Sequence, residues 1–258
     1  RSQTTLTELA RLGFAELGSA SERLEALGSP GLVPLLAAAA DPDQALVLLG
    51  TLRERAPEAV AAVVAVPDAA ARLIRVLGAS TGLGEFLARH PEQLIALTEP
   101  LDGPLTAEQY AADLLASVDG LQGDPAWVAL RVRYRRQLTR LAAWDLELAD
   151  PIVGFDRVAA ALADLAGAAL DASLAVARRD AAFPAEQVAA TRLAIIGMGK
   201  AGARELNYVS DVDVIFVGES ADPDLLGDDR AVEIATRLAM QTMKGIHELA
   251  VEPGLWEV

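Results

Sequence analysis

The segment from Leu193 to Val217 constrains the fold most, because two short apolar runs enclose a glycine-rich turn and a pair of aspartates. The runs at 193–196 and 212–217 have the length and composition of buried β-strands. Residues 203–210 are all that separates Gly202 from Asp211, and a crossover between parallel strands needs ten residues or more. The two strands are therefore predicted to be antiparallel neighbours, or members of a small mixed sheet.

Asp211 and Asp213 stand out within the second apolar run. In a β-strand, residues i and i+2 share a face, so both carboxylates are predicted to point to one side of the sheet. Neighbouring carboxylates repel each other unless a cation lies between them, and Mg²⁺ and Mn²⁺ prefer such oxygen ligands. We expect the pair to bind Mg²⁺ or Mn²⁺. The alternative is that the carboxylates cap nearby N–H groups.

The chain before residue 186 has a helical pattern, with apolar residues at three- and four-residue spacing. Proline at a helix start marks several boundaries, and Thr106 with Gln109 predicts a capping box. The proline signals are Asp41-Pro42, Ala56-Pro57-Glu58, His90-Pro91-Glu92 and Asp124-Pro125. The longest helices are predicted over 125–148 and 155–179. Without a fixed repeat period, a helical bundle is favoured over a solenoid.

The remaining residues predict a smaller α/β part. A turn or single helical turn is expected over 200–206 and a helix over 230–249, with an apolar stripe of Val232, Ala235, Leu238, Ala239, Ile246 and Leu249. Residues 255–258 predict a third strand. The fold class is therefore mainly α: a helical domain over 1–185, then an incomplete α/β domain with a small mixed sheet over 186–258.

Composition excludes several functions. The net charge of −15 argues against nucleic-acid binding, which depends on many Lys and Arg contacts to phosphates. The most apolar runs, such as 60–66, are shorter than the ~18 residues of a transmembrane helix, so no membrane association is expected. The sequence contains no cysteine and no signal peptide, which fits a cytoplasmic location. Because residue 1 is arginine, we take the chain to be a fragment or a processed form.

The glycine turn has two interpretations. Gly197, Gly199 and Gly202 match G-x-G-x-x-G, and Glu219 lies where a dinucleotide-binding fold places its ribose-binding acid. The short connection to Asp211 argues against that fold. The other interpretation is a phosphate-binding turn followed by a metal-binding Asp-x-Asp on the next strand, the layout of the nucleotidyltransferase superfamily.

Three segments extend this layout to a specific family. The sequence GMGKAGARELNYVSDVDVIFV at 197–217 resembles the signature of the glutamine synthetase adenylyltransferase/adenylyl-removing enzymes, and it is closest to that of their amino-terminal half. LGASTGLGEFLARHPEQL at 77–94 and LRVRYRRQLTRLAAWDL at 130–146 resemble two further segments of the family. The resemblance covers most of the chain from about Leu77 onward.

The resemblance implies phosphorolysis of an AMP-tyrosine diester on glutamine synthetase. Phosphate attacks the phosphorus, and ADP and free tyrosine are released. The implied ligands are Mg²⁺ or Mn²⁺, ATP or ADP, and phosphate, and a PII-type nitrogen signalling protein is an implied partner. The resemblance also implies that Asp211 and Asp213 are catalytic. The implied nucleotide- and phosphate-binding residues are Gly197, Gly199, Lys200, Gly202, Arg204 and Ser210. A third carboxylate is also implied, either Glu257 or a residue beyond Val258, and we expect the chain alone to bind weakly and turn over little.

The arginine-rich segment and the histidines have less specific interpretations. Arg133, Arg136 and Arg140 share one helix face, where they either pair with nearby acids or reach the nucleotide or the partner enzyme. His90 and His247 are isolated and are interpreted as structural. A second function, from a different class, is a non-catalytic docking module for glutamine synthetase or a PII-type protein.

Overall fold

The computed structural model describes residues 5–248 and 250–256. The chain divides into two contact units, which are described separately. Unit 1 comprises residues 1–103 and 139–151, and unit 2 comprises 104–138 and 152–258. The boundary passes through the long helix α9 (Gly123–Asp145). The predicted domain limits of 1–185 and 186–258 concern a different division, by secondary-structure type, and stay a prediction.

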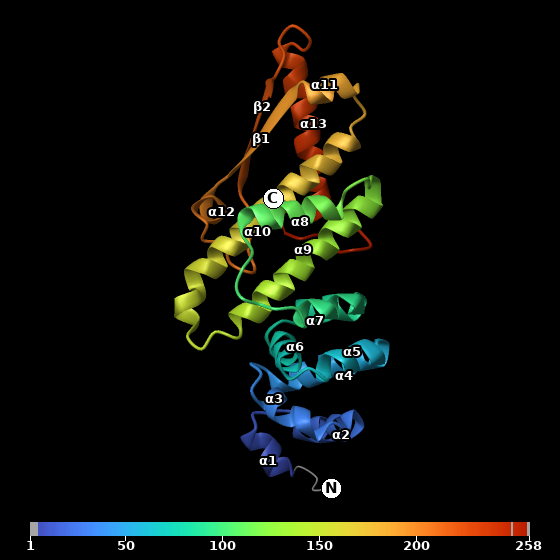
Figure 1. The fold of residues 1–258 in the computed structure, drawn as a ribbon, viewed down its shortest axis with the longest axis vertical. Coiled ribbons are helices and arrows are strands. Elements are labelled where there is room, and N and C mark those ends of the chain that lie inside the picture. Colours follow the sequence, from blue (N-terminus) through green and yellow to red (C-terminus); the bar gives the residue numbers. More distant parts are fainter. Residues whose placement is uncertain (1–4, 249, 257–258) are drawn as a thin grey trace. The chain divides into compact units, whose positions relative to one another are not determined.

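Unit 1 is built from short helices that follow one another along the chain (Figure 1). They are α1 (Leu6–Arg11), α2 (Leu17–Leu27), η1 (Pro30–Leu32), α3 (Val33–Ala37), α4 (Pro42–Arg55), α5 (Pro57–Val64), α6 (Pro67–Ala79), α7 (Thr81–Arg89) and η2 (Pro91–Leu97). Asp41 caps α4 by accepting from the Gln44 N–H, as its Asp-Pro signal predicts. The signal at His90 marks a 3₁₀ helix, η2.

The core of unit 1 lies between α4, α6 and α7. Its fully buried side chains include Leu49, Leu73 and Phe86. A Cβ atom at Gly84 would lie 2.6 Å from a methyl carbon of Leu48, so the absence of a side chain at this position lets α7 approach α4. Arg72 forms an ion pair with Glu147 at 3.0 Å, within the same unit.

Unit 2 combines helices with a two-stranded sheet. Its elements are α8 (Ala107–Ser117), the first part of α9, α10 (Pro151–Arg179), α11 (Ala185–Ala189), β1 (Thr191–Gly197), α12 (Gly199–Ala203), β2 (Val214–Ser220) and α13 (Asp228–His247). The mainly α fold class is therefore confirmed, as is the Thr106–Gln109 capping box of α8. α9 and α10 start two and four residues before their predicted first residues, Pro125 and Phe155.

The two strands are antiparallel, with Thr191 opposite Ser220 and Gly197 opposite Val214. The short glycine-containing connection permits no other arrangement. One sheet face packs against α13, which contacts both strands (Figure 1). The opposite face leaves Ile196, Ile215 and Val217 roughly half exposed.

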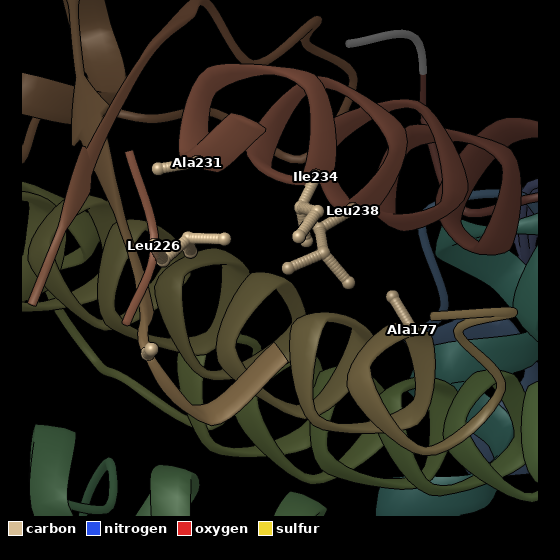
Figure 2. Close-up of a cluster of buried hydrophobic side chains, with 6 residues drawn as sticks. Ala177, Leu226, Ala231, Ile234 and Leu238 are labelled. Atoms are coloured by element: carbon tan, nitrogen blue, oxygen red, sulfur yellow. The ribbon is translucent and has the colours of Figure 1, made fainter. Parts of the chain in front are cut away.

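The interior between α13, β1 and α10 is aliphatic. Figure 2 shows Leu226, Ala231, Ile234 and Leu238 gathered on the side of α13 that faces Ala177 of α10. The stripe of α13 thus includes Ala231 and Ile234, whereas the predicted Val232 is half exposed. Leu249 lies outside the described residues.

One helix among the described residues, α10, is long and apolar enough to cross a membrane by length and composition. This helix is longer than the apolar run 60–66 on which the prediction of no membrane association rests. In the structure, 67% of its most apolar window is buried. A buried core helix passes the same test, so this feature is weak evidence for a membrane span.

Two predictions about strands are wrong. Strand β2 begins at Val214, two residues after the predicted start, because its partner β1 ends at Gly197 and the chain then turns. Leu255 and Trp256 are not in a strand. The Leu255 N–H donates to the Ile246 carbonyl of α13, and Arg135 donates to the carbonyls of Pro253 and Gly254, so helices satisfy this backbone. The rest of that prediction, residues 257–258, lies outside the described residues.

Candidate functional site

Asp211 and Asp213 lie in an extended segment that leads into β2, and this position corrects the prediction that both lie within the strand. Both carboxylates are exposed, and Val212 between them is buried. The alternation expected of an extended chain is therefore kept. The exposure of both acids agrees with a shared side, which stays a prediction, and the pairing of β2 with β1 starts one residue later, at Val214.

The glycine turn lies directly against the second aspartate. The Met198 N–H donates to the Asp213 carbonyl over 2.8 Å, which continues the strand pairing by one step. A Cβ atom on Gly199 would lie 3.1 Å from Asp213 Oδ2, and Gly199 has φ of +49°. The Asp213 carboxylate therefore borders the backbone of the turn at position 199. This position favours glycine because its φ is positive and because a Cβ atom would crowd the carboxylate.

The turn itself is tightly closed. A Cβ atom at Gly202 would lie 2.4 Å from the Gly197 carbonyl oxygen, and the Gly202 N–H donates to Met198 over 2.9 Å. The residues between them form α12, the single helical turn that the sequence predicts. The closure of the turn thus brings Gly197, Gly199 and Gly202 together beside Asp213.

The polar residues of the predicted site have partners within the loop or on α10. Lys200 Nζ donates to Asn207 Oδ1 at 3.1 Å, and the Asn207 amide donates to the Val209 carbonyl. Ser210 Oγ lies 3.4 Å from Asp211 Oδ1. Arg204 forms an ion pair with Asp164 of α10 at 2.5 Å. The structure therefore places Ser210 beside Asp211, pairs Lys200 with Asn207 of the following loop, and directs the Arg204 guanidinium toward Asp164 of α10.

A pocket of about 540 Å³ borders Asp211 and Ser210. Much of its wall is aliphatic or aromatic, with contributions from Tyr134, Tyr208 and Trp256. The Tyr134 and Trp256 rings are in contact, with centroids 4.8 Å apart. Burial raises the pKa of Tyr134, so its hydroxyl stays protonated at neutral pH.

The structure also reveals a buried arginine that sequence analysis did not single out. Arg131 of α9 is 2% exposed and donates to the Gly245 carbonyl at 2.8 and 3.0 Å and to the Glu252 carbonyl at 2.6 Å. Burial lowers its pKa, and the charges of Glu248, Glu252 and Asp124 oppose that shift. Arg131 belongs to the arginine-rich segment 130–146, but its acceptors are backbone carbonyls, which a sequence cannot reveal.

The other arginines pair locally. Arg133 lies 3.6 Å from Asp113, and Arg140 pairs with Glu99 within unit 1. Arg136 also has a polar or ring contact and is not a free cation. These contacts favour the first of the two interpretations, pairing with nearby acids. His90 contacts Glu92 and the Phe86 ring, which agrees with a structural role.

Comparison with known proteins gives a consistent result. The family model for glutamate-ammonia ligase adenylyltransferase matches residues 70–258. A bifunctional glutamine synthetase adenylyltransferase/adenylyl-removing enzyme of Leifsonia xyli is 54% identical over the whole chain, and those of Streptomyces coelicolor and Mycobacterium avium are 41% and 39% identical over 100% and 93% of it.

The chain spans about a quarter of the length of these relatives: 27%, 26% and 24%, respectively. The match includes the glycine turn, the aspartate pair and the arginine-rich helix, since all three lie within residues 70–258. The chain belongs to the glutamate-ammonia ligase adenylyltransferase family.

Proposed function

We propose that this chain contributes to a metal-dependent nucleotidyl-transfer site that acts on glutamine synthetase. The reaction is the removal of AMP from an adenylylated tyrosine, with release of ADP. One observation carries the proposal: the glycine turn and Asp213 are in direct contact, through the Met198–Asp213 hydrogen bond and the close approach of Gly199 to the Asp213 carboxylate. A phosphate group held at the turn therefore lies beside the proposed metal ligands.

The donor set suits Mg²⁺ or Mn²⁺. Asp211 and Asp213 offer exposed carboxylate oxygens, and no third acid, histidine or cysteine among the described residues joins them in a metal-binding group. Mg²⁺ typically binds proteins through one or two carboxylates and completes its shell with water and substrate phosphates. The two aspartates fit that arrangement. Glu257, the proposed third carboxylate, lies outside the described residues.

The proposed chemical step is a transfer of the adenylyl group from tyrosine to phosphate. A phosphate oxygen forms a bond to the adenylyl phosphorus, the bond to the tyrosyl oxygen breaks, and that oxygen takes up a proton to become the phenol. Bound divalent ions offset the charge on the phosphoryl oxygens. Asp211 and Asp213 would hold those ions. The backbone of the turn and Lys200 bind the phosphate oxygens, and Ser210 orients Asp211.

The pocket beside Asp211 belongs to the same proposal. Its aromatic and aliphatic wall suits a planar ring, and both the adenine and the tyrosyl group of the substrate carry one. Glutamine synthetase is the target that the relatives' names give. A PII-type regulator and a cytoplasmic location complete the proposal.

Calorimetric titration of this chain with Mn²⁺, and then with ADP, tests the site. We expect measurable Mn²⁺ binding, tighter ADP binding in the presence of Mn²⁺, and a higher melting temperature with both ligands. Asp213→Asn should abolish all three effects. The matched control is Asp222→Asn, which removes an acid from the loop after β2.

Unchanged Mn²⁺ and ADP binding in Asp213→Asn would contradict the proposal. Metal-independent binding to glutamine synthetase, with no change in melting temperature on adding Mn²⁺ and ADP, would favour the docking module instead. Release of ADP from adenylylated glutamine synthetase and phosphate, lost in Asp213→Asn, would establish the reaction itself.

A further inference from the structure

Arg204 has an unusual backbone conformation. It is the residue other than glycine with positive φ among the described residues, with φ of +58° and ψ of +40°. The left-handed region is unfavourable for side chains with a Cβ atom, and the position that follows a helix in this conformation is usually glycine. An arginine here indicates that its side chain has a role.

The backbone of Arg204 closes the glycine turn. Its N–H group donates to the Ala201 carbonyl at 3.2 Å, and the next N–H, of Glu205, donates to the Lys200 carbonyl at 2.8 Å. This pattern is the left-handed cap that ends a helix. After it the chain reverses and buries Leu206. The conformation at Arg204 therefore sets the path from the turn to the aspartates.

The side chain of Arg204 connects the turn to α10. Its guanidinium lies 2.5 Å from Asp164 Oδ2, and the two side chains are 59% and 15% exposed. Asp164 is on α10, whose neighbouring residues Leu162, Ala163 and Leu165 are buried. The Asp164 carboxylate thus lies on a helix that is buried around it, and the ion pair joins the end of the glycine turn to that helix.

We infer that Asp164 and Arg204 are positioning residues that hold the glycine turn in register with Asp213. Without the ion pair, the turn keeps its hydrogen bonds but loses its fixed place on α10. The expected effect of the ion pair on ligand affinity rests on the proposed function. The expected effect of the ion pair on the mobility of the turn does not, because the pair forms without any ligand.

A direct contact between Arg204 and phosphate makes a different prediction. If the guanidinium binds phosphate itself, Asp164→Asn frees it and leaves the affinity equal or higher. If the pair positions the turn, Asp164→Asn weakens binding as much as Arg204→Gln does. Asp164 distinguishes the two roles because it does not line the pocket beside Asp211.

Hydrogen exchange measured by mass spectrometry tests the mobility of the turn. We expect faster exchange over residues 199–206 in Asp164→Asn and in Arg204→Gln, with the exchange of α10 unchanged. The control is Arg192→Gln, which removes another exposed ion pair, that of Arg192 with Glu219 on the sheet. Unchanged exchange over 199–206 in both variants would overturn the inference.

Titration with Mn²⁺ and ADP tests the consequence for binding. Each single variant should weaken ADP affinity about fivefold, in the range expected for one partly exposed ion pair. The double variant should lose no more than either single one, because the two residues act as a unit. Asp164→Asn with the parent's affinity, alongside a weakened Arg204→Gln, would assign direct phosphate binding and refute the positioning role.

Arg204→Gly separates positioning from overall stability. Glycine adopts the left-handed conformation without strain, so the melting temperature should be no lower than that of the parent, while ADP affinity falls as in Arg204→Gln. A parallel loss of melting temperature and affinity would indicate a merely structural role. If the parent chain binds neither Mn²⁺ nor ADP, the proposed function fails, and the exchange experiment still decides whether the pair holds the turn.

Discussion

At the residue scale, the glycines of the turn differ in what a side chain would meet. A Cβ atom at Gly202 would lie 2.4 Å from a backbone oxygen, which cannot move aside as a flexible side chain can. At Gly199 the nearest atom belongs to a carboxylate, at 3.1 Å. The sequence pattern G-x-G-x-x-G alone does not distinguish these positions. Their differences follow from the closure of the turn between Gly197 and Gly202.

Gly202→Ala should therefore destabilise the protein by about 2 kcal/mol or more, through displacement of the turn. The matched control is Gly167→Ala in the middle of α10, where a new Cβ atom meets nothing within 4 Å. This second change should stabilise the protein by about 0.5–1 kcal/mol, because alanine is the better helix former. Urea denaturation measures both. Equal effects of the two substitutions would contradict the predicted close approach.

At the element scale, α9 holds the segment after α13. Arg131 donates to the Gly245 carbonyl of α13 and to the Glu252 carbonyl after it. Arg135 donates to the carbonyls of Pro253 and Gly254 and pairs with the Glu252 carboxylate at 2.9 Å. A Cβ atom at Gly245 would lie 2.3 Å from the Trp127 ring, so the two helices are in close contact. This segment supplies Leu255 and Trp256 to the pocket beside Asp211.

Arg131→Met should lower the free energy of unfolding by about 3 kcal/mol, because buried carbonyls lose charged donors. Arg133→Gln, on the same helix but with a half-exposed ion pair at 3.6 Å, should change it by less than about 0.5 kcal/mol. Chemical denaturation gives the comparison. Similar losses of unfolding free energy in both variants would contradict the stabilising role of the buried Arg131 hydrogen bonds.

The helices were more predictable than the boundaries of the strands. Proline and capping signals are local, so α4, α5 and α8 begin at or beside the predicted residues. The start of β2 depends on where β1 ends, and the fate of Leu255 and Trp256 depends on arginines more than a hundred residues earlier. The same distinction applies to the site: the glycines and Asp213 are neighbours as expected, but the partner of Arg204 on α10 has no signature in the sequence.

At the scale of the whole molecule, each of the two units has its own buried core. Leu73 lies in the core of unit 1 and Leu238 in that of unit 2, both 1% exposed or less. All of the proposed site residues that the structure describes are in unit 2. Among the described residues, the proposed site therefore draws on unit 2, whereas unit 1 has a core of its own.

Leu73→Ala and Leu238→Ala should each destabilise the protein by about 2–5 kcal/mol, the range for cavities in a core. Hydrogen exchange should show the lost protection within the unit that carries the substitution. Leu73→Ala should retain the parent's affinity for Mn²⁺ and ADP at temperatures where it remains folded. Loss of protection across both units from either substitution would show that they unfold together.

Val212 gives the aspartate pair a further property. Its side chain is 2% exposed and is flanked by the two exposed acids. Asp211 and Asp213 thus precede and follow one buried valine in the chain, so a shift of Val212 would displace both carboxylates together. Under the proposed function, the affinity for Mg²⁺ or Mn²⁺ is expected to depend on how well Val212 packs, although this side chain would not contact the ion.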